Sequence, residues 1–220
     1  MNNHSEHLDA LRDIKQMMEK SSRFISLSGF SGIAAGSCAL IGAAFAYPLV
    51  YENNSSLLPS QNRETSLYDP AFPYLTHKGG ELLLIALLTF TAAFLSAFIF
   101  TYLRSKKTNT PVWNKASKRL TFHVLFPLLA GGIYLLKLLQ LGTLGMIAPG
   151  CLIFYGLALL NASKYTLKEI QYLGISEILL GVLTLFFTGG GLYFWAIGFG
   201  LLHIFYGTIM WWKYERGTRS

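Results

Sequence analysis

Six long apolar segments, separated by more polar connections, make up most of this chain of 220 residues. A helix needs about 20 mainly apolar residues to cross the hydrocarbon core of a bilayer, and within lipid a helix satisfies its own backbone hydrogen bonds. Only 13% of the residues are charged, which is too few to cover a surface that faces water. We therefore expect an all-α membrane protein with a bundle of six transmembrane helices. The expected helices cover residues 25–50, 81–103, 120–138, 144–162, 172–188 and 192–212.

The positions of lysine and arginine predict the orientation of this bundle. Cytoplasmic loops of membrane proteins carry an excess of both residues. Fifteen of them lie before the first segment, after the last one, or in the second and fourth connections, whereas the other connections contain only Arg63 and Lys78. We therefore expect both termini in the cytoplasm. The net charge of +7 follows from this distribution and indicates no surface for nucleic acid.

The polar stretches divide the chain further. Residues 1–24 are the expected cytoplasmic N-terminal helix, residues 25–212 the transmembrane domain and residues 213–220 a cytoplasmic tail. The long connection 52–80 contains three prolines and many polar residues, which disfavour regular structure. We expect this connection to be an external loop.

Residues 5–23 have the pattern of an amphipathic helix. Apolar side chains recur there every three or four residues, and acidic and basic side chains occupy the positions between them. Such a helix could pack on its own bundle, lie on the membrane surface, or bind a protein partner or a second copy of the chain. The sequence leaves these alternatives open.

The first apolar segment carries small residues at a spacing of four, namely Ser28, Gly32 and Gly36. Small residues at this spacing share one face of a helix and allow a second helix to approach closely. We therefore expect a close helix–helix contact along this face. A partner helix from the same bundle is the simpler interpretation, and a second subunit is the alternative.

Two ionisable residues lie within the last two apolar segments, Glu177 in one and His203 in the other. Charged groups are costly inside a bilayer, so they mark functional sites by default. A short glycine turn joins the two segments, and we expect the two side chains to meet in the cytoplasmic half of the bundle. The pair could relay a proton or hold a polar or cationic ligand. It could also be a structural pair that fixes helix register, or Glu177 could extend to water.

The sequence IFYG occurs twice, at 153–156 and at 204–207, and brings further polar groups to this region. The repeat suggests that the hairpin of the third and fourth segments resembles that of the fifth and sixth. Tyr155 and Tyr206 are then expected at similar depth, with His123 near the same end of the bundle. The predicted cluster for a ligand or a proton relay consists of Glu177, His203, Tyr155, Tyr206 and His123.

Both ends of the chain resemble an uncharacterised family of small bacterial multi-pass membrane proteins. The resemblance lies in LRDIKQMMEKSSRFISLSGFSGI, in KYTLKEIQYLGISEILLG and in LYFWAIGFGLLHIFYGTIMWWKYE. It implies a location in the bacterial inner membrane. It implies no activity and no functional residues.

Signature motifs of enzymes are missing from the sequence, which has no His-Glu-x-x-His, no Gly-x-Ser-x-Gly and no phosphate-binding Gly-Lys-Ser/Thr loop. Cysteine and histidine lack the spacing of metal ligands, and we expect no metal and no cofactor. The leading interpretation is a non-enzymatic scaffold or regulatory protein embedded in the lipid bilayer. The alternatives are a small transporter or channel with a polar site around Glu177 and His203, and an intramembrane enzyme that acts on lipid.

Overall fold

The computed structural model describes residues 27–51, 77–108, 113–187 and 189–216. All regular elements within these ranges are helical, and no strand occurs in them. The all-α fold class predicted from the apolar segments is therefore confirmed for the described part of the chain. The helix expected over residues 5–23 lies outside the described residues, as does most of the loop expected over 52–80.

The helices follow the apolar segments, with shifted ends. They are α2 (Gly29–Tyr51), α3 (His77–Lys107), α4 (Lys115–Gln140), η1 (Leu144–Met146), α5 (Ile147–Ala162), η2 (Ser163–Tyr165), α6 (Lys168–Thr184), α7 (Gly191–Trp195), η3 (Ala196–Leu202) and α8 (His203–Tyr214). Because α3 begins at His77, the last residues of the loop expected over 52–80 are helical. Because α8 continues to Tyr214, the first residues of the tail expected over 213–220 are helical too.

Five helical stretches among the described residues are long and apolar enough to cross a membrane. They are Gly29–Tyr51, Gly80–Lys107, Lys115–Gln140, Leu144–Tyr165 and Gly191–Tyr214. The helix in the place of the expected fifth span, α6, has 17 residues, includes Glu169 and Glu177, and is not one of the five. The described fold is thus consistent with a multi-pass membrane protein.

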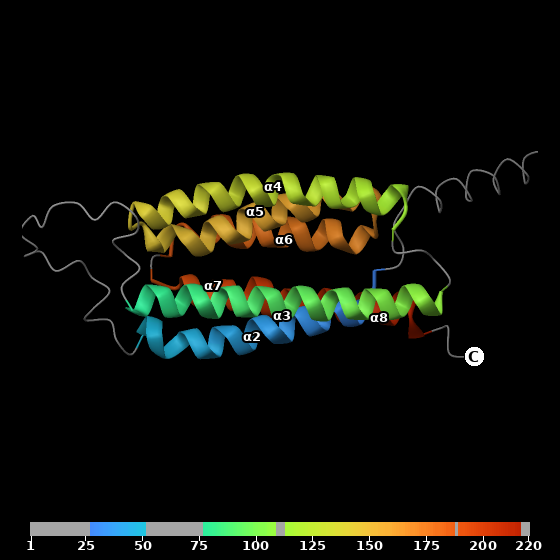
Figure 1. Cartoon of the computed structure of the whole chain (residues 1–220), viewed down its shortest axis with the longest axis horizontal. Helices are drawn as coiled ribbons and strands as arrows, with labels where there is room; N and C mark the ends of the chain where they lie inside the picture. The colour runs from blue at the N-terminus through green and yellow to red at the C-terminus, as the bar shows by residue number, and fades with distance from the viewer. Residues whose placement is uncertain (1–26, 52–76, 109–112, 188, 217–220) are drawn as a thin grey trace, which may run out of the picture.

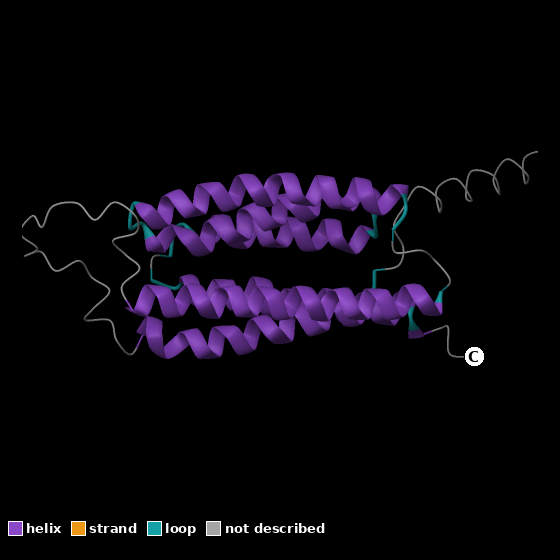
Figure 2. Ribbon diagram, viewed as in Figure 1, coloured by secondary structure: helices purple, strands orange, loops and turns teal. Residues whose placement is uncertain are grey.

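The helices form two groups of three, which are separated in Figures 1 and 2. One group consists of α4, α5 and α6, with α5 between its neighbours, and the other consists of α2, α3 and the α7–η3–α8 segment, with α2 in the middle. The groups meet where α7, η3 and α8 contact α5 and α6. The start of α2 and the end of α8 lie at the same end of the bundle, on the right in Figure 1, which we call the terminal end.

Glycines bring α2 and α8 into close contact. Gly32 faces Gly207, and Gly36 faces Gly200, so that a Cβ atom on Gly36 would lie 2.6 Å from the carbonyl oxygen of Gly200. The small-residue face of α2 therefore meets helices of the same chain. Ser28 has a different position, because it precedes the helix and its hydroxyl donates a hydrogen bond of 3.1 Å to Glu215.

A second close contact joins α5 and α6. A Cβ atom on Gly156 would lie 2.7 Å from the carbonyl oxygen of Gly174, and one on Gly174 would lie 2.8 Å from the carbonyl oxygen of Gly156. The last residues of the two IFYG sequences both lie at a close helix–helix contact, since Gly156 packs on α6 and Gly207 packs on α2. The two hairpins differ in their packing. In the first, α4 and α5 pack on each other, whereas in the second α6 packs mainly on α5 and α8 packs mainly on α2.

Candidate functional site

Three polar side chains from three helices meet where the two helix groups are in contact. The hydroxyl of Tyr155 on α5 lies 2.7 Å from Nε2 of His203, the first residue of α8, and Nδ1 of His203 lies 3.5 Å from Oε1 of Glu177 on α6. Each residue occupies the middle of its helical stretch, because Tyr155 is the twelfth of 22 residues and His203 the thirteenth of 24. This polar cluster of Tyr155, Glu177 and His203 therefore lies near the midplane of the bundle.

Glu177 has an unusual environment within the cluster. Its side chain is 0% exposed, and neither carboxyl oxygen has a hydrogen-bond partner. A Cβ atom on Gly198 would lie close to the carboxyl group of Glu177 and to methyl groups of Leu152 and Leu180, so apolar side chains surround this part of the site. An unpaired carboxylate in such surroundings is expensive, so the carboxyl has to carry a proton or gain a cationic partner. Glu177 is therefore the residue that any chemistry at this site has to involve.

The hydrogen bonds of His203 indicate which ring nitrogen carries a proton. Nδ1 lies 3.0 Å from the carbonyl oxygen of Gly198, which can only accept a hydrogen bond. Nδ1 is therefore the donor in this arrangement, and Nε2 of the neutral ring accepts a hydrogen bond from the hydroxyl of Tyr155. The imidazole ring lies between the hydroxyl of Tyr155 and the buried carboxyl of Glu177, which is the order that a proton relay requires.

The π-helix η3 positions this histidine. A π-helical turn is wider than an α-helical one and occurs frequently at functional sites. Gly198 lies within η3, and its carbonyl oxygen accepts the hydrogen bond from Nδ1 of His203. A Cβ atom on Gly198 would lie 2.6 Å from Oε2 of Glu177, so the absence of a side chain there makes room for the carboxyl group.

The two other residues predicted for the cluster lie elsewhere. The hydroxyl of Tyr206 lies 3.3 Å from that of Ser176, beside the cluster but without a described contact to it. Nε2 of His123 lies 3.0 Å from the hydroxyl of Tyr165, and the two rings are stacked with their centroids 4.8 Å apart. His123 therefore joins α4 to η2 and is not part of the site around Glu177.

Two groups of charged residues join helices at the terminal end. The guanidinium of Arg104 on α3 lies 2.8 Å from a carboxyl oxygen of Glu215, just after α8. Lys213 on α8 lies 2.7 Å from a carboxyl oxygen of Glu169 on α6, which also accepts a hydrogen bond from Tyr214. No sequence motif marks these contacts, because residues more than 40 positions apart form them.

The Glu169 group has a clear electrostatic consequence. Burial on its own would raise the pKa of the Glu169 carboxyl, but hydrogen bonds from Lys213, from the residue's own backbone and from Tyr214 outweigh burial and lower this pKa below its ordinary value. Glu169 precedes the apolar part of α6 and is therefore ionised at neutral pH. Its role is to hold α6 against α8.

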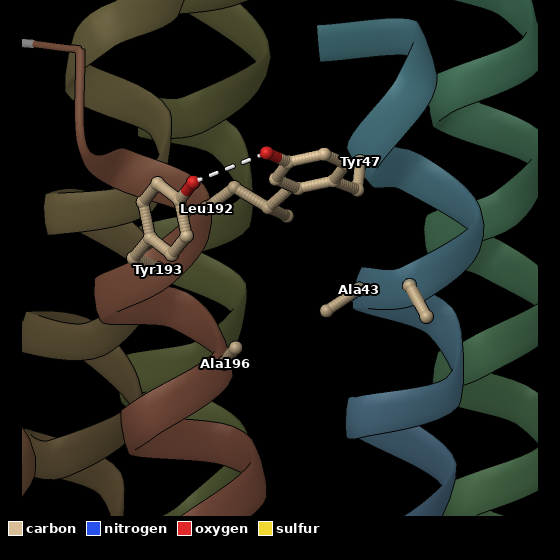
Figure 3. A pocket seen from close by; sticks show the side chains of 6 residues that line it. Ala43, Tyr47, Leu192, Tyr193 and Ala196 are labelled. Carbon is tan, nitrogen blue, oxygen red and sulfur yellow. Dashed lines mark hydrogen bonds between the residues drawn. The ribbon is translucent and has the colours of Figure 1, made fainter. Parts of the chain in front are cut away.

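An open groove lies at the opposite end of the bundle, between α2 and α7. It has a volume of about 310 Å³ and is lined by Ala43, Ala44, Tyr47, Leu192, Tyr193 and Ala196. Figure 3 shows the hydroxyl of Tyr193 donating a hydrogen bond of 3.5 Å to that of Tyr47 across one end of the groove. The walls are otherwise apolar, which suits an acyl chain of a neighbouring lipid better than a polar ligand. None of the residues of the polar cluster lines this groove.

Comparison of the chain with protein-family models, with curated proteins and with solved structures finds no match. The class of the protein therefore rests on its fold, which is an all-helical bundle with five candidate membrane spans in the described residues.

Proposed function

We propose that this chain is a small proton transporter of the bacterial inner membrane, with six transmembrane helices and cytoplasmic termini. The sixth crossing is supported by α6, which packs along α5 and lies lengthwise in the bundle (Figure 1). An even number of crossings places both termini on one side. The excess of lysine and arginine in the connections on that side supports a cytoplasmic location.

The observation that carries the transport proposal is the fully buried Glu177 without a hydrogen-bond partner. An ionisable residue held at the midplane of a membrane bundle is costly and is typical of proton relays and ion pathways. A structural pair would be expected to satisfy both of its members with hydrogen bonds. Nδ1 of His203 instead donates to Gly198 and leaves the carboxyl oxygens of Glu177 unpaired.

The three groups of the polar cluster can pass one proton to Glu177 without a net change in the charge of the histidine, whose proton moves from Nδ1 to Nε2. A proton that arrives at the Tyr155 oxygen displaces the hydroxyl proton to Nε2 of His203. Nδ1 of His203 then releases its proton to the Glu177 carboxylate. The result is a neutral carboxyl, a neutral imidazole with its proton on Nε2, and an unchanged tyrosine hydroxyl. Tyr155 is the outer end of this relay, and the enclosed Glu177 is its inner end.

The position of the polar cluster between the two helix groups also supports transport. Tyr155 and Glu177 belong to the group with α4, whereas His203 belongs to the group with α2. Transporters commonly bind their substrate near the midplane, at the interface between two bundles that move against each other. A small displacement of one group would separate His203 from Glu177 and so interrupt the relay.

The scaffold interpretation favoured by the sequence rests on residues 5–23, which lie outside the described residues. Transport rests on contacts of described side chains, and for that reason we prefer it.

Proton flux into proteoliposomes tests this function. The full chain is reconstituted with a pH-sensitive dye in the lumen, and a potassium gradient with valinomycin drives protons inward. We expect faster acidification than in protein-free liposomes, a loss of this excess in Glu177→Gln, and retention of the excess in Ser176→Ala. Ser176 is the matched control because it precedes Glu177 on α6 and contacts Tyr206 instead of the polar cluster. Equal flux in the wild type and in Glu177→Gln would overturn the proposal.

A further inference from the structure

Aromatic rings form a continuous row that ends at the polar cluster. The ring centroids of Trp195 and Phe199 are 5.1 Å apart, those of Phe199 and His203 are 6.1 Å apart, and the Tyr155 ring lies 5.0 Å from that of Phe199. Trp195, Phe199 and His203 recur every four residues and so lie along one side of the α7–η3–α8 segment. We call the rings of Trp195, Phe199 and Tyr155 the aromatic row.

The aromatic row connects the surface of the bundle with its midplane. Trp195 is the fifth residue of the span Gly191–Tyr214, near the end opposite the terminal end, and His203 is the thirteenth. At no more than the α-helical rise of 1.5 Å per residue, these eight residues cover at most about 12 Å along the helix axis. Trp195, Phe199 and Tyr155 are half-buried, so part of each ring can be reached from the lipid. The row therefore ends beside the carboxyl group of Glu177, which is enclosed and has no hydrogen-bond partner.

We infer that the polar cluster and the aromatic row bind a hydrophobic organic cation, such as a quaternary ammonium or phosphonium ion, in competition with the proton on Glu177. This inference rests on the proposed function, because it names the substrate that the proton movement serves. The face of an aromatic ring attracts a cation, and a nearby carboxylate neutralises its charge. Aromatic rings that lead to a buried carboxyl group can therefore recognise a hydrophobic organic cation.

The composition of the site distinguishes this ligand from a metal cation. A hard cation requires six or more oxygen ligands, whereas the described groups around Glu177 offer its carboxyl, the carbonyl of Gly198 and the hydroxyl of Tyr155. The described residues also contain no group of three or more histidine, cysteine or acidic side chains placed to hold a metal ion. The other side chains described next to Gly198 and the Glu177 carboxyl are those of Leu152 and Leu180, whose apolar surface suits a cation with an apolar surface.

Competition at Glu177 keeps the bound site neutral. The protonated carboxyl releases its proton as the cation arrives, and the carboxylate and the cation then form a neutral pair. Among the residues that the structure describes, the titratable groups that face Glu177 are His203 from α8 and, beyond it, Tyr155 from α5. The neighbours of Glu177 one turn away on α6 are Leu173, Gly174, Leu180 and Gly181, none of which carries a charge. Proton and cation therefore compete for one carboxylate, and binding of the cation weakens as the pH falls.

Equilibrium binding of tetraphenylphosphonium to the full chain in lipid nanodiscs tests the inference. We expect saturable binding that is at least tenfold weaker at acidic than at alkaline pH and is lost in Glu177→Gln. Phe199→Leu should weaken binding roughly threefold to tenfold, because the ring face is lost. Phe205→Leu is the matched control, since Phe205 is an exposed aromatic residue on the same segment outside the aromatic row. Tetraphenylborate, an anion of the same shape, should not bind at a saturable site.

The outcomes separate this inference from the proposed function. Absence of saturable tetraphenylphosphonium binding, or binding that neither Glu177→Gln nor Phe199→Leu weakens, overturns the inference. If proton flux into proteoliposomes still depends on Glu177 in that case, the transport proposal stands with a different substrate. If flux is independent of Glu177 as well, both are wrong. The dependence on pH in the wild-type protein and the Phe199→Leu variant keep the inference testable if Glu177→Gln does not fold.

Discussion

A carboxyl oxygen of Glu215 accepts a hydrogen bond of 2.6 Å from the backbone amide of Gly29, the first residue of α2. The amides at the start of a helix have no partner within the helix, and a negative charge there is stabilised by the helix dipole. Glu215 therefore caps α2 from the far end of the chain. Arg104 on α3 donates to the same carboxyl group, so one side chain holds together the terminal ends of α2, α3 and α8.

Replacing Glu215 by glutamine is expected to lower the free energy of unfolding by about 1–2 kcal/mol, because the cap of α2 and the ion pair with Arg104 are weakened together. The measurement is unfolding in a denaturing detergent, followed by circular dichroism. Glu81→Gln is the control, since Glu81 is an exposed carboxylate on α3. Equal stability of the two variants would show that the cap contributes nothing.

Replacing Gly156 by alanine is expected to destabilise the bundle by about 1–3 kcal/mol, because the new Cβ would lie 2.7 Å from the carbonyl oxygen of Gly174. Gly132→Ala is the matched control. Gly132 is also within a helix, but a Cβ there meets nothing within 4 Å, so stability should stay the same or rise by up to about 1 kcal/mol. Thermal unfolding of both variants in one detergent makes the comparison, and a Gly156→Ala variant as stable as Gly132→Ala would contradict it.

The two IFYG tyrosines should differ in their effect on proton flux. Tyr155→Phe removes the hydroxyl that contacts Nε2 of His203 and is expected to slow flux into proteoliposomes roughly tenfold or more. Tyr206→Phe changes the equivalent residue of the second IFYG sequence, whose hydroxyl contacts Ser176, and should leave flux within about twofold. Equal rates for the two variants would remove Tyr155 from the relay.

The contribution of Glu169 to stability is expected to depend on pH. The pKa of Glu169 is lowered in the folded protein, so the folded state holds this proton less tightly than the unfolded state does. The resulting stabilisation is complete above the ordinary carboxyl pKa of 4.5 and is lost as the pH falls from there through the lower pKa of the folded state. Midpoints of thermal unfolding for wild type and Glu169→Gln should therefore differ at pH 7 and converge as the solution becomes more acidic than about pH 4. A difference that is independent of pH would show that Glu169 acts only through packing.

The positions of the helices could be predicted well from the sequence, because a bilayer tolerates only long apolar helices and these are visible as uninterrupted segments. The meeting of Glu177 and His203 was also predictable. One short turn joins their helices, and few polar groups in the spans are available to pair. The exact helix ends were less predictable, since α6 begins earlier and α8 ends later than the apolar segments do.

Other features of the site leave no trace in a hydrophobicity pattern. The π-helix η3 depends on how the backbone adapts to α2, α5 and α6, and sequence spacing alone does not show it. His123 was grouped with Glu177 by depth, but its distance around the bundle is set by the packing of α4 on α5. Glu215 and Arg104 meet only because α2, α3 and α8 are neighbours in space.

The length of α6 has a consequence for the surrounding membrane. Its 17 residues cover about 26 Å, whereas the hydrocarbon core of a bilayer is about 30 Å thick. With 31 residues, α3 covers about 46 Å. In the six-span arrangement the leaflets have to thin beside α6 while α3 tilts or extends beyond them, which costs a fraction of a kcal/mol for each Å of mismatch. Lipids with short chains should therefore gather along one flank of this protein, and its conformational equilibrium should shift with the thickness of the bilayer.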